Sequence, residues 1–156
     1  MRIEHLKKTH VRTNFDCGTP ELNRYFQEIV SQDVRRRENS CFVLTEDDSD
    51  KVLGFYTLSP SAIMRSRLKT LSFSRRIWVP VYLLGKLAVD ISCQGRHYGS
   101  ILVSDAATRC MQAEIQAVGL FATLKHPGLI TFYLKNGFTT LSELEVFLPF
   151  PKFHSR

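Results

Sequence analysis

The sequence lacks the features that would place it in a membrane or around a structural metal. No uninterrupted apolar run approaches the roughly 18 residues that a membrane-spanning helix needs, and the N-terminal MRIEHLKKTH has no apolar core of a signal peptide. The four cysteines are scattered, with no CxxC pair and no histidine at zinc-ligand spacing. We therefore expect a cytoplasmic protein with free thiols, no bound metal and no membrane attachment.

Internal repeats and low-complexity tracts are absent as well. With 156 residues, 44% of them hydrophobic, the chain can bury one core but is too short to build two. A single domain over residues 1–156 is therefore predicted. Lysine and arginine number 21 against 15 acidic residues, a net charge of +6. This excess favours polyanionic partners such as nucleic acid or phosphate-rich cofactors.

The first half of the chain predicts a helix, then a hairpin. Thr19 followed by Pro20 is typical of a helix start, and one helical face is apolar, with Leu22, Tyr25, Phe26, Ile29 and Val30. Residues 41–47 and 51–59 are rich in β-formers and predict two antiparallel strands. Residues 59–80 have no clean period and are expected to form a long, partly structured connection.

The second half alternates strands and helices. A central strand is predicted over residues 81–90, a helix from Ser100 to about Ala117 and a buried strand over 117–124. A short helix closed by Gly137 and at least one strand within 139–150 follow. This order predicts an α/β (α+β) fold with a mixed central sheet flanked by helices.

The segment CQGRHYGS, residues 93–100, joins the predicted central strand to the next helix. In a strand–turn–helix arrangement, the helix N–H groups and the positive end of the helix dipole can face a phosphate. Neither GxGxxG nor GxxxxGK[ST] is present, which excludes the Rossmann and Walker loops. The residues alone fit an anion site and a plain tight turn about equally well.

A longer segment around this turn, LLGKLAVDISCQGRHYGSILVSDA, resembles the acetyl-CoA signature of the GNAT N-acetyltransferase superfamily. The resemblance implies that acetyl-CoA is the co-substrate and that the strand backbone at Leu87 and Val89 binds its pantetheine arm. It further implies a pyrophosphate loop made of Gln94, Gly95, Arg96, His97, Gly99 and Ser100.

His97 departs from the family pattern, which usually has glycine at this position. A histidine keeps its backbone N–H but adds a side chain where space is tight and a positive φ is wanted. The departure leaves open a degenerate member that binds acetyl-CoA weakly and serves as a binding module for RNA or an antitoxin-like protein. Glycine at this position should raise cofactor affinity sharply only in that case.

The segment TFYLKNGF, residues 131–138, is similar to the FYxxxGF segment near the GNAT C-terminus. The resemblance implies that Tyr133 is the general acid that protonates the departing CoA thiolate, a proton transfer that a phenol can make. Without the resemblance, Tyr133 reads as a half-buried aromatic residue on a short helix. Phe132 and Phe138 are expected in the core.

Three further segments, FDCGTPELNRYF, QDVRRRENSCFVL and VLGFYTLSPSAI, are similar to the GNAT toxins of bacterial toxin–antitoxin pairs. This resemblance implies acetylation of the α-amine of an aminoacyl-tRNA, a ribbon-helix-helix antitoxin as partner, and allows a homodimer. The aminoacyl ester lowers the amine pKa, so no carboxylate base is required, and Asp90 is expected to be a cap or turn residue. An acetyltransferase for another amine remains the alternative enzyme.

Binding of tRNA would require basic surface, which two groups of residues offer: Arg35, Arg36 and Arg37 at the end of the first helix, and Arg65, Arg67, Lys69, Arg75 and Arg76 in the connection. Both groups can also be read as solvated faces, and arginines suit a helix C-terminus. Trp78 could stack on a base, but we expect it to pack the connection onto the domain. His10 is expected to be exposed.

Overall fold

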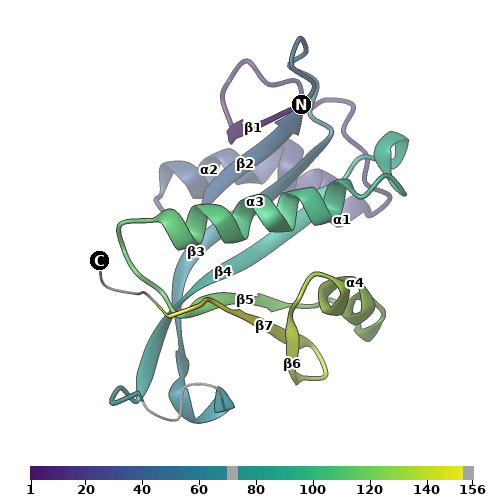
Figure 1. Cartoon of the computed structure of the whole chain (residues 1–156). Coiled ribbons are helices and arrows are strands. Elements are labelled where there is room, and N and C mark those ends of the chain that lie inside the picture. Colours follow the sequence, from purple (N-terminus) through teal and green to yellow (C-terminus); the bar gives the residue numbers. More distant parts are fainter. Residues whose placement is uncertain (70–73, 153–156) are drawn as a thin grey trace. The chain divides into compact units, whose positions relative to one another are not determined.

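The protein is described here by a computed structural model, covering residues 1–69 and 74–152, which contains a mixed seven-stranded sheet with helices (Figure 1). The strand order is β1-β2-β3-β4-β5-β7-β6. β4 pairs with β5 in parallel, whereas the β1–β2, β2–β3, β5–β7 and β6–β7 pairs are antiparallel. The predicted α/β fold class is therefore confirmed.

The strands are β1 (Arg2–His5), β2 (Ser40–Thr45), β3 (Gly54–Met64), β4 (Trp78–Val89), β5 (Gly119–Thr123), β6 (Thr139–Ser142) and β7 (Glu145–Pro149). The helices are α1 (Pro20–Arg24), α2 (Val30–Arg35), α3 (Tyr98–Gln112) and α4 (Ile130–Lys135), and a π-helical turn (Tyr25–Ile29) joins α1 to α2.

The chain divides into two compact units. The first unit is Met1–Ser59 with Gly85–Ala106, and the second unit is Pro60–Leu84 with Ala107–Arg156. The strands β3 and β4 and the helix α3 each contribute residues to both units. The single domain that the chain length predicts stays a prediction.

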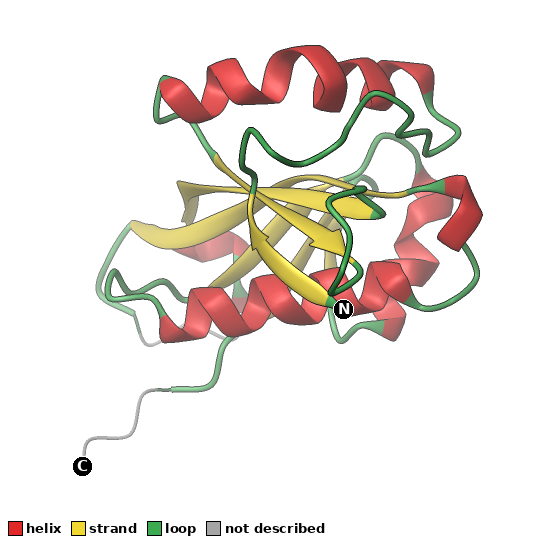
Figure 2. Cartoon of the chain, turned by 90° about the horizontal axis from the view of Figure 1, so that it is seen from above, coloured by secondary structure: helices red, strands yellow, loops and turns green. Residues whose placement is uncertain are grey.

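Alternation along β3 builds the first unit, because neighbouring side chains on a strand point to opposite faces. Phe55 stacks on Phe26 of the π-helical turn with ring centroids 4.1 Å apart. The next residue, Tyr56, donates a hydrogen bond from its hydroxyl to Asp105 of α3 at 2.6 Å. Helices therefore cover both faces of these strands, as Figure 2 shows.

The predicted first helix is confirmed, and the π-helical turn within it was not predicted. The helix begins after Thr19, which is extended with φ −116°. Within the turn, the Val30 N–H bonds to the carbonyl of Tyr25, five residues back. The Arg12 guanidinium donates to the Phe26 carbonyl at 2.8 Å, which satisfies a backbone acceptor inside the turn. Such turns are frequent at functional sites.

The second unit has its own apolar cluster, in which Ile63, Leu68, Val79, Val81 and Phe147 are buried. Gly119 on β5 is required there, because a Cβ atom would overlap the Phe147 ring and the Leu148 carbonyl oxygen. Gly137 follows α4 with φ +90°, so the predicted glycine end of this helix is confirmed.

The connection predicted over residues 59–80 is shorter than predicted, because strand structure enters it from both ends. β3 runs on to Met64, β4 begins at Trp78, and the Arg65 N–H donates to the Ile77 carbonyl at 2.8 Å. The apolar pattern missed this strand because Pro60, Ser61 and Ala62 are exposed and show no alternation. Residues 70–73 of the predicted connection lie outside the described residues.

Two smaller expectations also need correction, and one strand was missed. The helix predicted to reach Ala117 ends at Gln112. β1 was not predicted. His10 was expected to be exposed but is only 5% exposed, because the Lys7 N–H donates to its Nδ1 and its Nε2 lies 2.9 Å from Glu4. No helix in the described ranges is both long and apolar enough to cross a bilayer.

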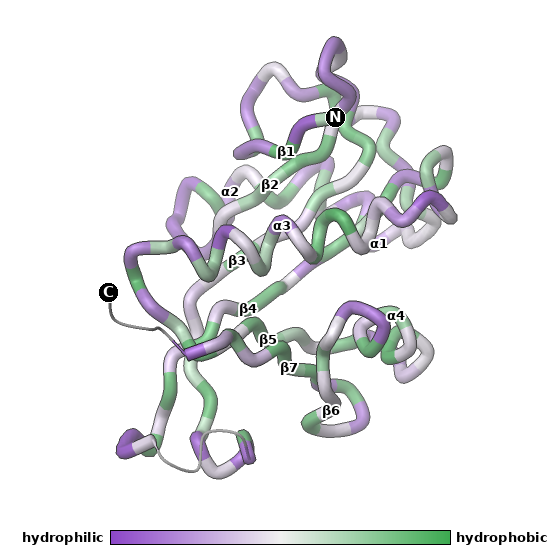
Figure 3. The backbone as a smooth tube through the Cα atoms, viewed as in Figure 1, coloured by the Kyte–Doolittle hydropathy of each residue, from purple (hydrophilic) through white to green (hydrophobic). Residues whose placement is uncertain are grey.

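Hydropathy follows this architecture. Hydrophobic residues line β2 and the adjoining part of β3, whereas hydrophilic residues gather at the far end of the β3–β4 hairpin (Figure 3). The hydrophobic strands are buried in the first unit, where Val43, Leu44 and Phe55 have no exposed surface. Burial of such apolar side chains is the dominant favourable contribution to folding.

We expect Phe55→Ala to lower the free energy of unfolding by about 3–5 kcal/mol, because it removes a fully buried ring that contacts Phe26 and Phe15. Ile115→Ala is the control: Ile115 is 75% exposed, and its loss should change stability by less than about 0.5 kcal/mol. Urea denaturation followed by circular dichroism measures both values. Equal stability of the two variants would contradict the core assignment.

Candidate acyl-CoA and RNA site

The end of β4 is held by the carboxylate of Asp90, which is buried. Its Oδ1 accepts from the Asp16 N–H at 2.9 Å, and its Oδ2 accepts from the Ser92 N–H at 3.1 Å and the Ser92 hydroxyl at 2.6 Å. Burial alone would raise the pKa of Asp90, but these bonds and the Lys51 charge leave it below its usual value. Asp90 is a cap, as predicted, and its oxygens are occupied.

Gln94 anchors the loop that follows. Its Nε2 donates to the Val89 carbonyl at 3.0 Å and to the Cys17 carbonyl at 2.9 Å. The side chain thereby ties the loop to the end of β4 and to the segment before α1. Gln94 was predicted as a pyrophosphate ligand; its side-chain donors face the protein backbone, so only its backbone N–H remains to contact an anion.

Two loop residues take left-handed backbone conformations: Gly95 with φ +80° and His97 with φ +64°. Glycine adopts this conformation freely, whereas for histidine it is uncommon and costs about 1–2 kcal/mol. His97 thus has the backbone conformation that glycine would supply at this position. Its side chain and that of Arg96 are exposed.

α3 starts directly after His97. Its first intrahelical bond runs from the Ile101 N–H to the His97 carbonyl at 3.1 Å. The N–H groups of Tyr98, Gly99 and Ser100 therefore have no acceptor within the helix. Together with the positive end of the helix dipole, they can bind an anion. The structure thus brings together the loop and helix residues that the sequence predicted.

β4 supplies the peptide groups predicted to bind pantetheine. Its ladder with β5 covers Tyr82, Leu83 and Leu84, and the strand continues beyond that ladder to Val89. Leu87 and Val89 lie in this continuation, and both are half-buried. The backbone there can form a ladder with an extended, amide-containing arm.

Tyr133 lies in the second unit, on α4. Its ring is buried between Phe132 and Phe138, at centroid distances of 5.1 and 5.2 Å. Burial raises the pKa of Tyr133 to about 12, so the phenol is protonated throughout the neutral range. Within the described part of the chain its hydroxyl has no hydrogen-bond partner, which leaves the proton available for donation.

The predicted basic residues fall into two sets. Arg35, Arg36 and Arg37 end α2 and are exposed, and Arg37 has a left-handed φ of +62°, as is common after a helix. The others lie on the β3–β4 hairpin of the second unit: Arg65, Arg67, Lys69, Arg75 and Arg76.

Two hairpin arginines have structural partners. Arg67 forms an ion pair with Glu145, and this pair and the Ser142 hydroxyl lower the pKa of Glu145. Arg65 donates from Nε to the Arg76 carbonyl at 3.0 Å. By contrast, the guanidinium groups of Arg75 and Arg76 form no ion pair within residues 1–69 and 74–152.

Trp78 lies beside these arginines and is 57% exposed, so the prediction that it packs the connection onto the domain is wrong. Ile77, its neighbour, is 70% exposed. Both residues lie at the hairpin end of β4, ahead of its ladder with β5, which begins at Tyr82. An aromatic ring among unpaired arginines is a surface suited to nucleic acid.

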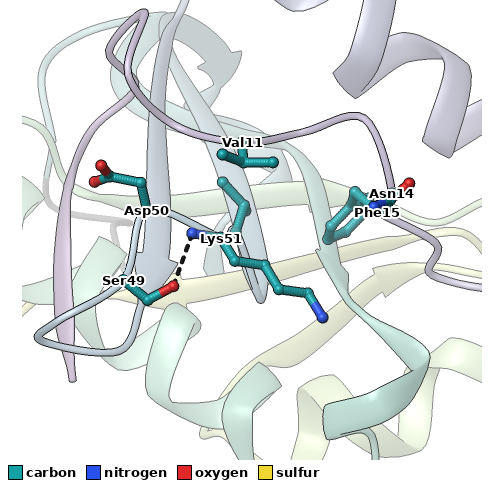
Figure 4. Close-up of a pocket in the computed structure, with 7 residues that line it drawn as sticks. Val11, Asn14, Phe15, Ser49, Asp50 and Lys51 are labelled. Atoms are coloured by element: carbon teal, nitrogen blue, oxygen red, sulfur yellow. Dashed lines mark hydrogen bonds between the residues drawn. The ribbon is translucent and has the colours of Figure 1, made fainter.

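A cavity of about 260 Å³ lies in the first unit between the residues after β1 and the loop before β3 (Figure 4). It is lined by Val11, Asn14, Phe15, Ser49, Asp50, Lys51 and Val52. The Lys51 N–H donates to the Ser49 hydroxyl, and the Lys51 side chain extends away from Ser49.

The described residues include no cluster of three or more metal-binding side chains.

The sequence profile of the acetyltransferase (GNAT) family matches residues 4–138. This match includes β4, the 94–97 turn, α3 and Tyr133. The chain therefore belongs to the acetyltransferase (GNAT) family, whose acyl donor is acetyl-CoA.

Comparisons with individual proteins give more detail than the family match. The chain is similar to the tRNA-acetylating toxin of Mycobacterium tuberculosis (strain ATCC 25618 / H37Rv), with 37% identity over 117 residues, 73% of this chain and 68% of the relative. Its fold matches AtaT complexed with acetyl-methionyl-tRNAfMet, with a TM-score of 0.88, 28% identity and coverage of 95% of this chain and 94% of that one. A mutant AtaT bound to the C-terminus of the antitoxin AtaR and acetyl-CoA matches with a TM-score of 0.79, 27% identity and coverage of 95% and 92%.

We expect His97→Gly to leave the dissociation constant for acetyl-CoA within about threefold of the unmodified value, because the backbone already has the left-handed conformation. His97→Val is the contrasting variant: a β-branched residue resists positive φ, so the turn should distort and affinity should fall about tenfold or more. Calorimetric titration with acetyl-CoA measures both. A large gain in affinity from glycine would show that the histidine obstructs the loop.

Proposed function

We propose that this chain is an acetyl-CoA-dependent N-acetyltransferase toxin that acetylates the α-amine of an aminoacyl-tRNA and so inhibits translation. The observation that carries the proposal is the turn ending at His97, whose left-handed backbone opens the N-terminus of α3 to an anion at the position of the family signature. The likeness to tRNA-acetylating relatives supports the RNA substrate.

In this proposal, peptide groups at Leu87 and Val89 bind the pantetheine arm of acetyl-CoA. The pyrophosphate is bound by backbone N–H groups from Gly95 onward and by the α3 N-terminus, and the Arg96 guanidinium adds a positive charge. His97 contributes its N–H, and Gly99 and Ser100 contribute two of the free N–H groups at the start of the helix. Gln94 holds the loop in place through its bonds to Val89 and Cys17.

The chemical step requires little acid–base chemistry from the enzyme. Acetyl-CoA supplies the acetyl group as a thioester, and the α-amine of an aminoacyl ester is neutral to a large extent near pH 7. The amine loses one proton as the amide forms, and the leaving thiolate gains one as the C–S bond breaks. Tyr133 donates the proton that the sulfur gains and takes up the one that the nitrogen loses, so no net proton is released; because its pKa is about 12, the phenol is protonated at the start of each turnover.

The RNA is held by basic surface. The hairpin residues Arg75 and Arg76 have no ion pair in the described part of the chain, and Arg65, Arg67 and Lys69 add positive potential. Trp78 offers a stacking surface to an unpaired base. The arginines that end α2, Arg35 to Arg37, extend the positive surface of the first unit. Because both sets of basic side chains lie on the surface, a role in binding RNA is favoured for both.

The proposal extends to the assembly of the protein. The two compact units form one acetyltransferase domain, because the family profile extends across both. The toxin works in the cytoplasm, where charged tRNA is found, and is neutralised by a ribbon-helix-helix antitoxin; a homodimer is compatible with this arrangement. The antitoxin complex of AtaT supports a protein inhibitor of this kind.

A degenerate member without acetyl-CoA binding is the second candidate. It required His97 to distort the loop, and the left-handed φ of +64° removes the reason for expecting that distortion. An acetyltransferase for another amine accounts less well for the exposed Trp78 beside Arg75 and Arg76.

We expect Tyr133→Phe to lower kcat about a hundredfold or more at saturating substrates, because phenylalanine fills the same space but donates no proton. Transfer of radiolabelled acetyl onto charged tRNA measures the rate. Tyr82→Phe is the control, since the Tyr82 hydroxyl in the same unit donates only to the Ile115 carbonyl. Because the Tyr133 phenol is protonated well above pH 9, it should add no alkaline limb to the pH–rate profile below that pH. An unchanged kcat would remove Tyr133 from the mechanism.

We expect the double variant Arg75→Gln/Arg76→Gln to raise KM for charged tRNA severalfold and to reduce the slope of log affinity against log salt concentration by up to about 2, about 1 for each lost phosphate contact. Lys7→Gln/Lys8→Gln removes the same charge from the exposed N-terminal segment and serves as the control. Equal salt slopes for both double variants would mean that the hairpin does not touch the RNA.

A further inference from the structure

Lys86 lies on β4 and was not among the site residues predicted from the sequence. It lies one residue before Leu87 and two before Ala88, so Lys86 and Ala88 share a face of the strand. Ala88 belongs to the buried cluster that contains Phe26 and Phe55. Lys86 therefore points to the face of β4 that the α1–α2 segment covers, adjacent to a residue proposed to bind pantetheine.

The side chain of Lys86 is held by an aromatic ring and not by a carboxylate. Its Nζ lies 5.3 Å from the ring centroid of Tyr25, within cation–π range. Tyr25 is itself fixed: its hydroxyl donates to Asp33 at 2.7 Å and accepts from Asn39 at 3.0 Å. In the part of the chain that the structure describes, Lys86 forms no ion pair, so its charge is positioned but not neutralised.

The backbone of Lys86 is fixed as well. Its N–H donates to the Thr57 hydroxyl at 2.9 Å, and Thr57 is buried on β3. The preceding residue is Gly85, where a Cβ atom would lie 2.9 Å from the same hydroxyl. A side-chain hydroxyl thus takes the place of a backbone acceptor at this point of the strand. The strand and the π-helical turn together hold one cation at a defined place in the first unit.

We infer that Lys86 binds the terminal phosphodiester of the acceptor RNA, the phosphate that joins the 3′-terminal nucleotide to the preceding nucleotide. The inference rests on the proposed function, in which the reacting amine is esterified to the terminal ribose and must approach the thioester beside Leu87. The terminal phosphodiester is then the anion nearest to the reacting ester, and a lysine binds phosphate as a point charge. An uncompensated, half-buried ammonium group gains most from such a partner.

Two minimal acceptors test this role: an aminoacyl-adenosine without a phosphate, and the aminoacylated dinucleotide CpA, which carries the terminal phosphodiester. For Lys86→Met, we expect KM for aminoacyl-CpA to rise about tenfold, while kcat/KM for aminoacyl-adenosine stays within about twofold of the unmodified protein. Lys86→Arg should retain most of the affinity for aminoacyl-CpA, because it keeps the charge. Lys8→Met is the control for loss of an exposed lysine in the same unit.

Other results would overturn the inference. An equal loss on both acceptors would mean that Lys86 does not recognise the phosphate, and a pH–rate profile shifted on both would mean that it acts on the pKa of the amine. Thermal unfolding of Lys86→Met and Lys86→Arg separates either result from a folding defect, in which case the arginine variant alone decides. Should the unmodified protein acetylate aminoacyl-tRNA but show the same KM for both acceptors, this inference fails while the proposed function stands. Should it acetylate no aminoacylated RNA, the proposed function fails first.

Discussion

The buried carboxylate of Asp90 is the interaction on which the site depends. One oxygen accepts the N–H of Asp16, from the segment before α1, and the other accepts both donors of Ser92. These bonds end β4 at a defined residue and turn the chain toward α3. A carboxylate that is buried must have its oxygens satisfied, so the geometry of the turn is specified strongly. The Gln94 carboxamide then joins the same two segments.

The loop that follows Asp90 has a backbone conformation suited to binding an anion. Gly95 and His97 both have positive φ, and α3 begins with N–H groups that lack acceptors within the helix. Histidine in a left-handed conformation costs free energy that glycine would not. The hydrogen bonds around Asp90 and Gln94 offset that cost, which explains how a histidine can occupy a position where the family usually has glycine.

The basic side chains divide into those with a partner in the protein and those without one in the described residues. Several cations have structural partners: Arg12 satisfies a carbonyl of the π-helical turn, Arg67 pairs with Glu145, and Arg65 bonds the Arg76 carbonyl. Others, such as Arg75, Arg76 and Lys86, have no carboxylate partner in the described residues. The net charge of the chain shows only that basic groups are in excess. The contacts in the structure identify which basic groups are available to a ligand.

Local sequence determined the strand 81–90, the turn with its glycine, the helix that follows and the glycine end of α4, because short-range periodicity and turn chemistry specify these elements. It could not place side chains whose surroundings come from distant segments. Trp78 is 57% exposed at the hairpin end of β4, and Tyr25 meets Lys86 only across the fold. The π-helical turn likewise depends on the packing of Phe26 against Phe55 and on Arg12, so only the tertiary structure decided it.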